Sequence, residues 1–117
     1  MRIIAESGIN HSGHLASALQ LVDLAHEAGC DYVKFQMRVP ELAVPKDQWN
    51  VPRQWGGEII PYIEYKKKLE LSERDYYAID SYCDKLGMGW TASVWDIPSL
   101  EKLAQFEPPF VKIPSAK

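Results

Sequence analysis

Several features that would identify a common class of protein are absent from these 117 residues. The net charge is only −3, which gives no field that would draw the chain to nucleic acid or to an anionic membrane. No apolar run approaches the roughly 18 residues needed to span a bilayer, and Glu6 interrupts the apolar start that a signal peptide requires. The sequence predicts one ordinary soluble globular domain.

Cysteine and histidine are too sparse to define a cross-linked or metal-binding scaffold. Cys30 and Cys83 lack the density and spacing of a disulfide framework or zinc site, so we expect buried thiols in a reducing cytoplasm. No two of the 3 histidines have metal-ligand spacing. The glycine-containing segment 7–13 lacks the Gly-Lys-Ser/Thr ending of a P-loop, which excludes a nucleoside triphosphate site of that kind.

The sequence does contain an alternation of strand-like and helix-like segments. Helical periodicity begins at Leu15 and stops at Gly29, a capping box opens a second helix at Ser72 that Gly87 ends, and Asp96 caps a third. Strand-like runs precede and follow these helices, at residues 3–6, 31–36, 89–93 and 109–114. This β-α-β-α-β-α-β order predicts parallel strands with right-handed crossovers.

One connection is far longer than the others. Residues 37–71 contain four prolines, and a short helix is expected near Pro61. Connections of this length inside a compact domain are usually functional or mobile. The run Lys66-Lys67-Lys68 could bind an anion, but a solvated helix face is the simpler interpretation.

The second predicted strand carries polar side chains where aliphatic ones would be expected. Side chains alternate across a strand, so Lys34 and Gln36 face the opposite way from Val33 and Phe35. A lysine is rarely buried without a partner, because desolvating its ammonium group is costly. Lys34 therefore either meets water at a sheet edge or lines a polar cavity that holds an anion.

The same anomaly recurs in two other predicted strands. The first strand ends its apolar run on Glu6, and the last is expected to bury Lys112 between Val111 and Ile113. Polar residues on one strand face and near strand carboxyl ends are typical of a TIM (β/α)₈ barrel, whereas both faces of an open doubly wound sheet are covered by helices. A whole barrel needs about 250 residues. We therefore predict an α/β fold that forms the first half of a barrel, with about four parallel strands.

Parallel neighbouring strands would bring these polar side chains to one mouth. Two lysines with nearby hydroxyl groups suit a small anion such as a phosphate or carboxylate. Alternatives remain for single residues: Glu6 could simply pair with Lys34, and His11, after Asn10 in the first loop, could contact a ligand or brace the loop. The candidate site consists of Glu6, Lys34, Gln36, Ser93, Lys112 and Ser115.

Three motifs resemble those of the sialic acid (N-acetylneuraminate) synthase family. Residues 5–13 are similar to the opening A-E-x-G-x-N-H-x-G of these enzymes, residues 28–36 to A-G-x-D-x-x-K-F-Q, and residues 112–115 to K-I-x-S. The motifs occur in the family's order and span nearly the whole chain.

The resemblance implies a TIM barrel that condenses phosphoenolpyruvate with an N-acylated amino sugar, usually N-acetylmannosamine, and releases phosphate. It implies catalytic roles for Glu6, Lys34 and Lys112. Substrate-binding roles would fall to Asn10, Gln36, Ser93 and Ser115. Ser93 and Ser115 would join the lysines around phosphoenolpyruvate, and Glu6 and Gln36 would face the amino sugar. It also implies a divalent metal, Mn²⁺ or Mg²⁺, and a homodimer of the full-length protein.

The chain departs from the family pattern in three respects. The family's metal-binding histidines lie in later strands that this chain lacks, so no metal ligand is assigned here. The carboxyl-terminal antifreeze-like domain is also missing, and residues 91–96 replace the common S-T-P-F-D motif while Ser93 keeps a hydroxyl group. We therefore expect residues 1–117 to be the amino-terminal portion of such a synthase and to be inactive alone.

Two other functions are compatible with the residues. The chain could be a non-catalytic half-barrel that binds a sugar or phosphate, or that assembles through its open sheet edges. It could also be related to the deoxy-sugar phosphate synthases, another class of barrel that uses phosphoenolpyruvate. The Asn10-His11 pair and residues 112–115 argue against the latter.

Overall fold

The computed structural model describes residues 2–114. Within this range, no helix combines the length and apolar character needed to cross a membrane. The main body consists of strands and helices in alternation, and its elements are β1 (Ile4–Gly8), α1 (Leu15–Glu27), β2 (Tyr32–Met37), α4 (Glu73–Leu86), β5 (Gly89–Val94) and α5 (Ile97–Ala104). Every helix and the first three strands of the predicted order are confirmed, with boundaries shifted by only a few residues.

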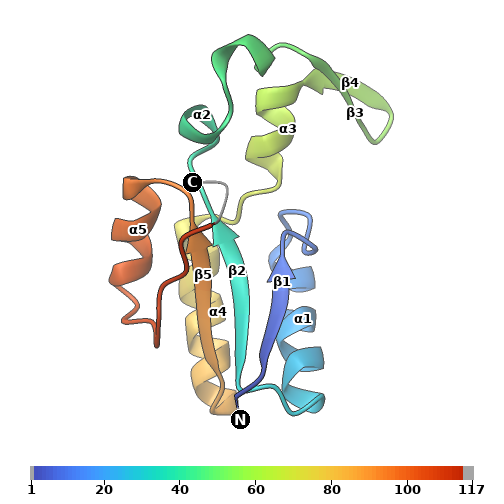
Figure 1. The fold of residues 1–117 in the computed structure, drawn as a ribbon. Coiled ribbons are helices and arrows are strands. Elements are labelled where there is room, and N and C mark those ends of the chain that lie inside the picture. The colour runs from blue at the N-terminus through green and yellow to red at the C-terminus, as the bar shows by residue number, and fades with distance from the viewer. Residues whose placement is uncertain (1, 115–117) are drawn as a thin grey trace.

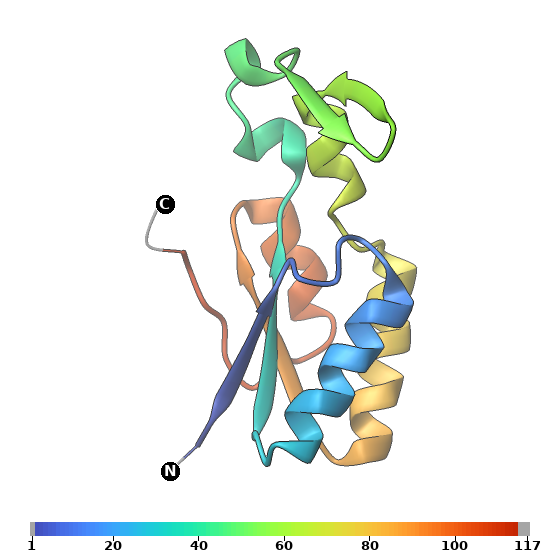
Figure 2. The same cartoon turned by 90° about the vertical axis from the view of Figure 1, so that its right-hand side faces the viewer.

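The three long strands form one parallel sheet in the order β1-β2-β5. Figure 2 shows α1 and α4 side by side against the same face of this sheet. Parallel strands that are adjacent in the sheet require a crossover connection, and both crossovers here place their helix on one side. The predicted α/β class with parallel strands is therefore confirmed.

The hydrophobic core lies between this face of the sheet and the two helices. Val33 and Phe35 of β2 and Ala92 of β5 are fully buried there, against Val22 of α1 and Ile79 of α4. Alternation along β2 places these side chains on the helix side and leaves Lys34 and Gln36 on the other face. The polar face of the sheet is thus a direct consequence of how its apolar face is packed.

Helix α4 begins and ends as its sequence predicts. The Ser72 hydroxyl accepts a hydrogen bond from the backbone N–H of Asp75, and the Asp75 carboxylate accepts one from the backbone N–H of Ser72. Gly87 ends the helix with a left-handed conformation at φ 70°. The cap and the glycine fix the length of α4, and hence where β5 starts.

The predicted fourth strand at 109–114 is wrong. Only Lys112 pairs with the sheet, through an isolated parallel bridge to Ser93 in which the backbone N–H of Val94 donates to the Lys112 carbonyl at 3.0 Å. Pro109 and Pro114 have no N–H to donate to a ladder, and no described strand lies on the far side of this segment.

Lys112 is also not buried between its apolar neighbours. Val111, Lys112 and Ile113 are all exposed in the described chain. The prediction of a buried lysine at this position is wrong, because burial would require a further layer of structure over the segment. The direction of the segment, parallel to β5, is nonetheless the one predicted.

The long connection, residues 38–71, is ordered and stands beyond the carboxyl ends of the strands (Figure 1). The helix expected near Pro61 is confirmed as α3. A β-hairpin was not predicted, although Gly56-Gly57 at its tip is a two-residue turn signal. The elements of this region are α2 (Pro40–Ala43), a 3₁₀ turn (Lys46–Gln48), β3 (Pro52–Trp55), β4 (Glu58–Pro61) and α3 (Tyr62–Lys68). We call residues 38–71 the rim region.

Candidate active-site face

The clearest polar contact on the free face of the sheet joins β1 to β2. Glu6 and Lys34 are register partners, and the Lys34 ammonium lies 2.7 Å from a carboxylate oxygen of Glu6. The Lys34 side chain is only 14% exposed, whereas that of Glu6 is 53% exposed. The interpretation of Glu6 as a partner of Lys34 is therefore confirmed, and the pair presents its carboxylate side to solvent.

The Gln36 side chain lies close to the backbone of Gly8, beside the Glu6–Lys34 pair. The pairing of β1 with β2 shifts register between Glu6 and Gly8, and Gly8 takes a left-handed conformation at φ 57°. A side-chain carbon at this position would contact both the Gln36 amide nitrogen and a Glu6 carboxylate oxygen at 3.7 Å. Glu6, Lys34 and Gln36 thus surround one small region at the end of β1.

Ser93 and Lys112 lie in the next row along the same face. Gln36 is the register partner of Ser93, and Ser93 is bridged to Lys112. Register partners in neighbouring strands project to the same side of a sheet, as do residues two apart in one strand. Lys34 and Lys112 are consequently on the same face, with Ser93 buried between β2 and the final segment.

The two remaining predicted site residues, Asn10 and Ser115, are not placed on this face of the sheet by the described structure. Asn10 lies exposed in the turn after β1, where its backbone N–H donates to the Ser7 carbonyl at 3.0 Å. Ser115 is outside the described residues. The structure therefore gathers five of the seven predicted site residues on one face of the sheet: Glu6, Lys34, Gln36, Ser93 and Lys112.

His11 is a bracing residue of the first loop. Its ring is buried, packs 6.0 Å from the Phe35 ring between centroids, and its Nδ1 accepts a hydrogen bond from the backbone N–H of Gly13 at 2.9 Å. Burial lowers the pKa of His11 from its usual 6.5, so the neutral form is favoured. An Nδ1 that accepts requires the proton on Nε2, which has no partner among the described residues.

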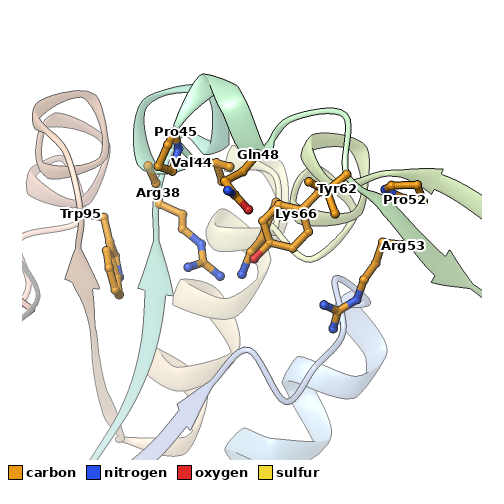
Figure 3. A pocket seen from close by; sticks show the side chains of 11 residues that line it. Arg38, Val44, Pro45, Gln48, Pro52, Arg53, Tyr62, Lys66 and Trp95 are labelled. Atoms are coloured by element: carbon orange, nitrogen blue, oxygen red, sulfur yellow. The ribbon is translucent and has the colours of Figure 1, made fainter.

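A cavity of about 470 Å³ lies between the rim region and the strand ends. Three cationic side chains line it, Arg38 after β2, Arg53 on β3 and Lys66 on α3, together with the rings of Tyr62 and Trp95. Figure 3 shows the nitrogen atoms of Arg38 and Lys66 directed toward the ends of the strands, whereas those of Arg53 lie apart from them, near the loop that follows β1. Arg38 was recognisable from its place two residues after Gln36 at a strand end, but Arg53 is brought here only by the unpredicted hairpin.

A buried ion pair joins the beginning of the rim region, directly after β2, to its end. Arg38 Nε donates to the Glu70 carboxylate at 2.9 Å, and both side chains are almost enclosed. Burial raises the pKa of Glu70 above its usual value, although the neighbouring Arg38 lowers it. Asp96 adds a second tie, because its carboxylate accepts from the backbone N–H of Val39 at 2.7 Å.

The described residues do not provide a metal centre. Within residues 2–114, no three side chains of histidine, cysteine, aspartate or glutamate are grouped as metal ligands. The polar face carries one carboxylate, Glu6, and it is already paired with Lys34. The donor set of this face therefore fits an anion and sugar hydroxyl groups better than it fits a divalent cation.

The sequence of this chain is similar to a family model and to several curated proteins. The model of the NeuB family matches residues 21–117. The chain is 35% identical over 117 residues to the N,N'-diacetyllegionaminic acid synthase of Legionella pneumophila, covering 98% of this chain and 33% of that protein. It is 36% identical to the N-acetylneuraminate-9-phosphate synthase of Drosophila melanogaster, covering 97% and 31% respectively. The chain thus spans about a third of the length of these curated relatives.

The fold of this chain is also similar to solved structures, over nearly the whole of its length. The crystal structure of an N-acetylneuraminic acid (sialic acid) synthetase from Leptospira borgpetersenii, determined in complex with citrate, matches with a TM-score of 0.78 and 25% identity. The match covers 95% of this chain and 35% of that one. A spore coat polysaccharide biosynthesis protein, SpsE, from Bacillus subtilis matches with a TM-score of 0.65 and 30% identity, over 96% of this chain and 28% of that one.

Proposed function

Because the chain belongs to the NeuB family, we propose that it is the amino-terminal portion of a sialic-acid-type synthase. In this proposal it forms the first part of a (β/α)₈ barrel. The reaction is the condensation of phosphoenolpyruvate with an N-acylated amino sugar such as N-acetylmannosamine. Helices on one face of the sheet and polar side chains on the other support a barrel, in which the helices form the outer ring and the free face lines the interior.

The observation that carries the proposal is the shared face of Lys34 and Lys112, with Glu6 paired to Lys34. Phosphoenolpyruvate carries a phosphate and a carboxylate on three carbons. Two ammonium groups on one face can neutralise these anions, and the Ser93 hydroxyl lies in the same row. Lys34 and Lys112 are therefore assigned to phosphoenolpyruvate.

The acceptor sugar would meet Glu6 and Gln36. Carbon 3 of phosphoenolpyruvate attacks the open-chain aldehyde, water adds at carbon 2, and the tetrahedral intermediate expels inorganic phosphate. Glu6 is more exposed than Lys34 and can accept hydrogen bonds from sugar hydroxyl groups or from the attacking water. The Gln36 amide, beside Gly8, can donate to the same substrate. Asn10 and Ser115 complete the proposed substrate-binding set.

A divalent metal, Mn²⁺ or Mg²⁺, would polarise the aldehyde as a Lewis acid when bound. We assign its ligands to the later strands in which the resemblance places the family's metal-binding histidines. The homodimer of the full-length protein is likewise part of the proposal.

The proposal is tested by measuring inorganic phosphate release from phosphoenolpyruvate in the presence of N-acetylmannosamine and Mn²⁺. We expect no turnover from residues 1–117 alone, and turnover once the reading frame is continued past codon 117. In the longer protein, Lys34→Gln or Lys112→Gln is expected to lower kcat/KM by about 10²-fold or more. Lys85→Gln, on an exposed site near the end of α4, is the matched control and should be unchanged. Clear turnover by the 117-residue chain would refute the expectation that it is inactive alone. Full activity of Lys34→Gln in the longer protein would refute the assignment of Lys34.

A second function is favoured by the open edges of the sheet. Among the described residues, strand β1 pairs with β2 alone. Ile3, which precedes β1, and Ile4, its first residue, are exposed, as is Ile113 near the other edge. An exposed apolar edge promotes pairing with another chain, which is the behaviour expected of an assembly module. Size-exclusion chromatography separates the two functions, because a discrete dimer supports a module and higher aggregates support an incomplete barrel.

A further inference from the structure

The first loop, residues 9–14, contacts the rim region where α3 ends. A side-chain carbon on Gly13 would lie 1.8 Å from the carbonyl oxygen of Lys68, the last residue of α3, and 3.5 Å from the Cα atom of Leu69. The Leu69 side chain is itself buried. The backbone of the first loop therefore determines where the carboxyl end of α3 can lie.

This loop has a backbone conformation that needs support. Ser12 at φ 55° and Gly13 at φ 79° are both left-handed, a conformation that a residue other than glycine adopts only at a cost. The backbone N–H of Gly13 donates to Nδ1 of His11 at 2.9 Å, and the backbone N–H of His14 donates to the His11 carbonyl at 3.1 Å. Of these two hydrogen bonds, only the one to the ring depends on the protonation state of His11.

The His11 ring is also anchored in the core. It is 1% exposed, and its centroid lies 6.0 Å from that of Phe35. Phe35 belongs to β2, where its neighbours Lys34 and Gln36 face the free side of the sheet. A ring that is fixed against β2 and also holds Gly13 connects the position of the sheet to the position of α3.

We propose that His11 is a positioning residue: its neutral ring holds the first loop in the shape that receives the end of α3, and protonation of the ring releases the rim region from this loop. A proton on Nδ1 replaces an acceptor by a donor, which would face the Gly13 N–H, another donor. The cations on α3 and β3 would then lose their fixed position relative to the strand ends. The bond from the Val39 N–H to Asp96 does not involve His11 and would keep the base of the rim region in place.

The groups that face the ring determine the direction of its response to pH. Burial lowers the pKa of His11 from 6.5, and His14 at the start of α1 adds to this effect. The backbone of Gly8 in β1 and the carboxylate of Asp75 in α4 raise the pKa, but burial is the largest influence. The neutral ring is therefore present above about pH 6.5 and is lost as the pH falls through the lowered pKa. We expect the rim region to be released on the acidic side of pH 6.5.

The test is a pH titration of the unmodified 117-residue chain by nuclear magnetic resonance. The ring signals of His11 report its protonation, and the nuclear Overhauser effect between the α protons of Gly13 and Leu69 reports the contact with the rim region. We expect this effect to weaken by about twofold or more as the pH falls, with the midpoint of the His11 ring. The effect between Phe35 and Ala92, which are register partners in the sheet, should stay unchanged.

Three variants separate His11 from other titrating groups. His11→Asn keeps an acceptor for the Gly13 N–H, so the contact should persist and lose its dependence on pH. His11→Leu removes the acceptor, so the contact should be weak at every pH. His14→Asn is the matched control, because it replaces an exposed histidine of the same loop and should leave the response unchanged.

Several results would overturn the inference. One is a contact that does not change with pH. Another is a change that persists in His11→Asn, which would assign it to a different group such as Glu70. A third is loss of the Phe35–Ala92 effect with the same midpoint, which would show that acid unfolds the whole chain. If His11→Leu does not fold, the unmodified chain and His11→Asn still decide the outcome. None of these measurements depends on turnover, so the proposed reaction can fail while this role of His11 stands.

Discussion

The sheet with its two covering helices and the rim region are stabilised in different ways. The first encloses a continuous core from β2, β5, α1 and α4, in which Phe35 and Ile79 have no solvent exposure. The rim region buries few apolar side chains, among them Val44 and Ile63. It relies instead on local turns, on the Arg38–Glu70 pair and on aromatic rings facing cations.

This difference matters for how the two regions can contribute to function. Glu6 and Lys34 are held on strands whose opposite face is packed into the core, so their separation is fixed by the sheet itself. Arg53 and Lys66 are placed by a hairpin and a short helix outside that core. Under the proposed function, the sheet would hold the reacting groups in fixed positions, whereas the rim region would contact the substrates from a less rigid support.

The largest expected effect compares one isoleucine from each region. Ile79→Ala in α4 removes a side chain with 0% exposure, and should lower the free energy of unfolding by about 2–5 kcal/mol. Ile59→Ala in β4 changes a side chain with 75% exposure, and should cost less than about 0.5 kcal/mol. Urea denaturation followed by circular dichroism measures both. Equal losses would show that the rim region shares the main core.

The contact between the regions is tested at Gly13. This residue has φ 79°, and a side-chain carbon there would lie 1.8 Å from the Lys68 carbonyl oxygen. Gly13→Ala should therefore cost more than the about 1–2 kcal/mol expected for left-handed backbone alone. Gly29→Ala is the matched control, because Gly29 has φ 81° with no atom within 4 Å of the added carbon. If thermal unfolding shows the same loss for both, the approach of α3 to the first loop is wrong.

The smallest effect concerns pH, where the two regions should respond with opposite signs. Burial lowers the pKa of His11, so between that lowered value and 6.5 the unfolded chain binds more protons than the folded one. Stability from His11 is therefore present above about pH 6.5 and is lost as the pH falls through this window. His11→Asn keeps an acceptor for the Gly13 N–H and should flatten the dependence of urea midpoint on pH there.

Glu70 in the rim region should act in the other direction. Burial raises its pKa above 4.5, so the folded chain binds the extra proton between 4.5 and the raised value. Stability then decreases as the pH rises through that window, and Glu70→Gln should remove this decrease. Urea midpoints measured from pH 4 to pH 8 for both variants provide the comparison. A Glu70→Gln profile identical to that of the unmodified chain would contradict the assignment.

The sequence predicts the sheet better than its surroundings, for a physical reason. Val33 and Phe35 alternate with Lys34 and Gln36, and this local pattern alone determines which face packs on helices. The segment 109–114 has a similar pattern but forms only one bridge, because a strand also needs a partner to pair with. Pairing is a property of the fold, and composition does not encode it.

The candidate site likewise has one part that the sequence predicted and one part that it did not. Glu6, Lys34 and Gln36 were predictable because they lie on strands whose apolar alternation determines the face that packs on the helices, although the register shift after Glu6 was not predicted. The cationic cavity was not, since Arg53 and Lys66 are 13 residues apart and meet only through the hairpin and helix of the rim region. The Gly56-Gly57 turn was the one signal of that hairpin available in the sequence.

The most direct test of the central proposal is a titration of the isotopically labelled 117-residue chain with phosphoenolpyruvate, followed by nuclear magnetic resonance. The proposal predicts saturable shifts of backbone amides at Glu6, Lys34 and Ser93, which disappear in Lys34→Gln and persist in Lys85→Gln. Shifts that survive in Lys34→Gln, or that occur only in residues remote from the free face of the sheet, would contradict it.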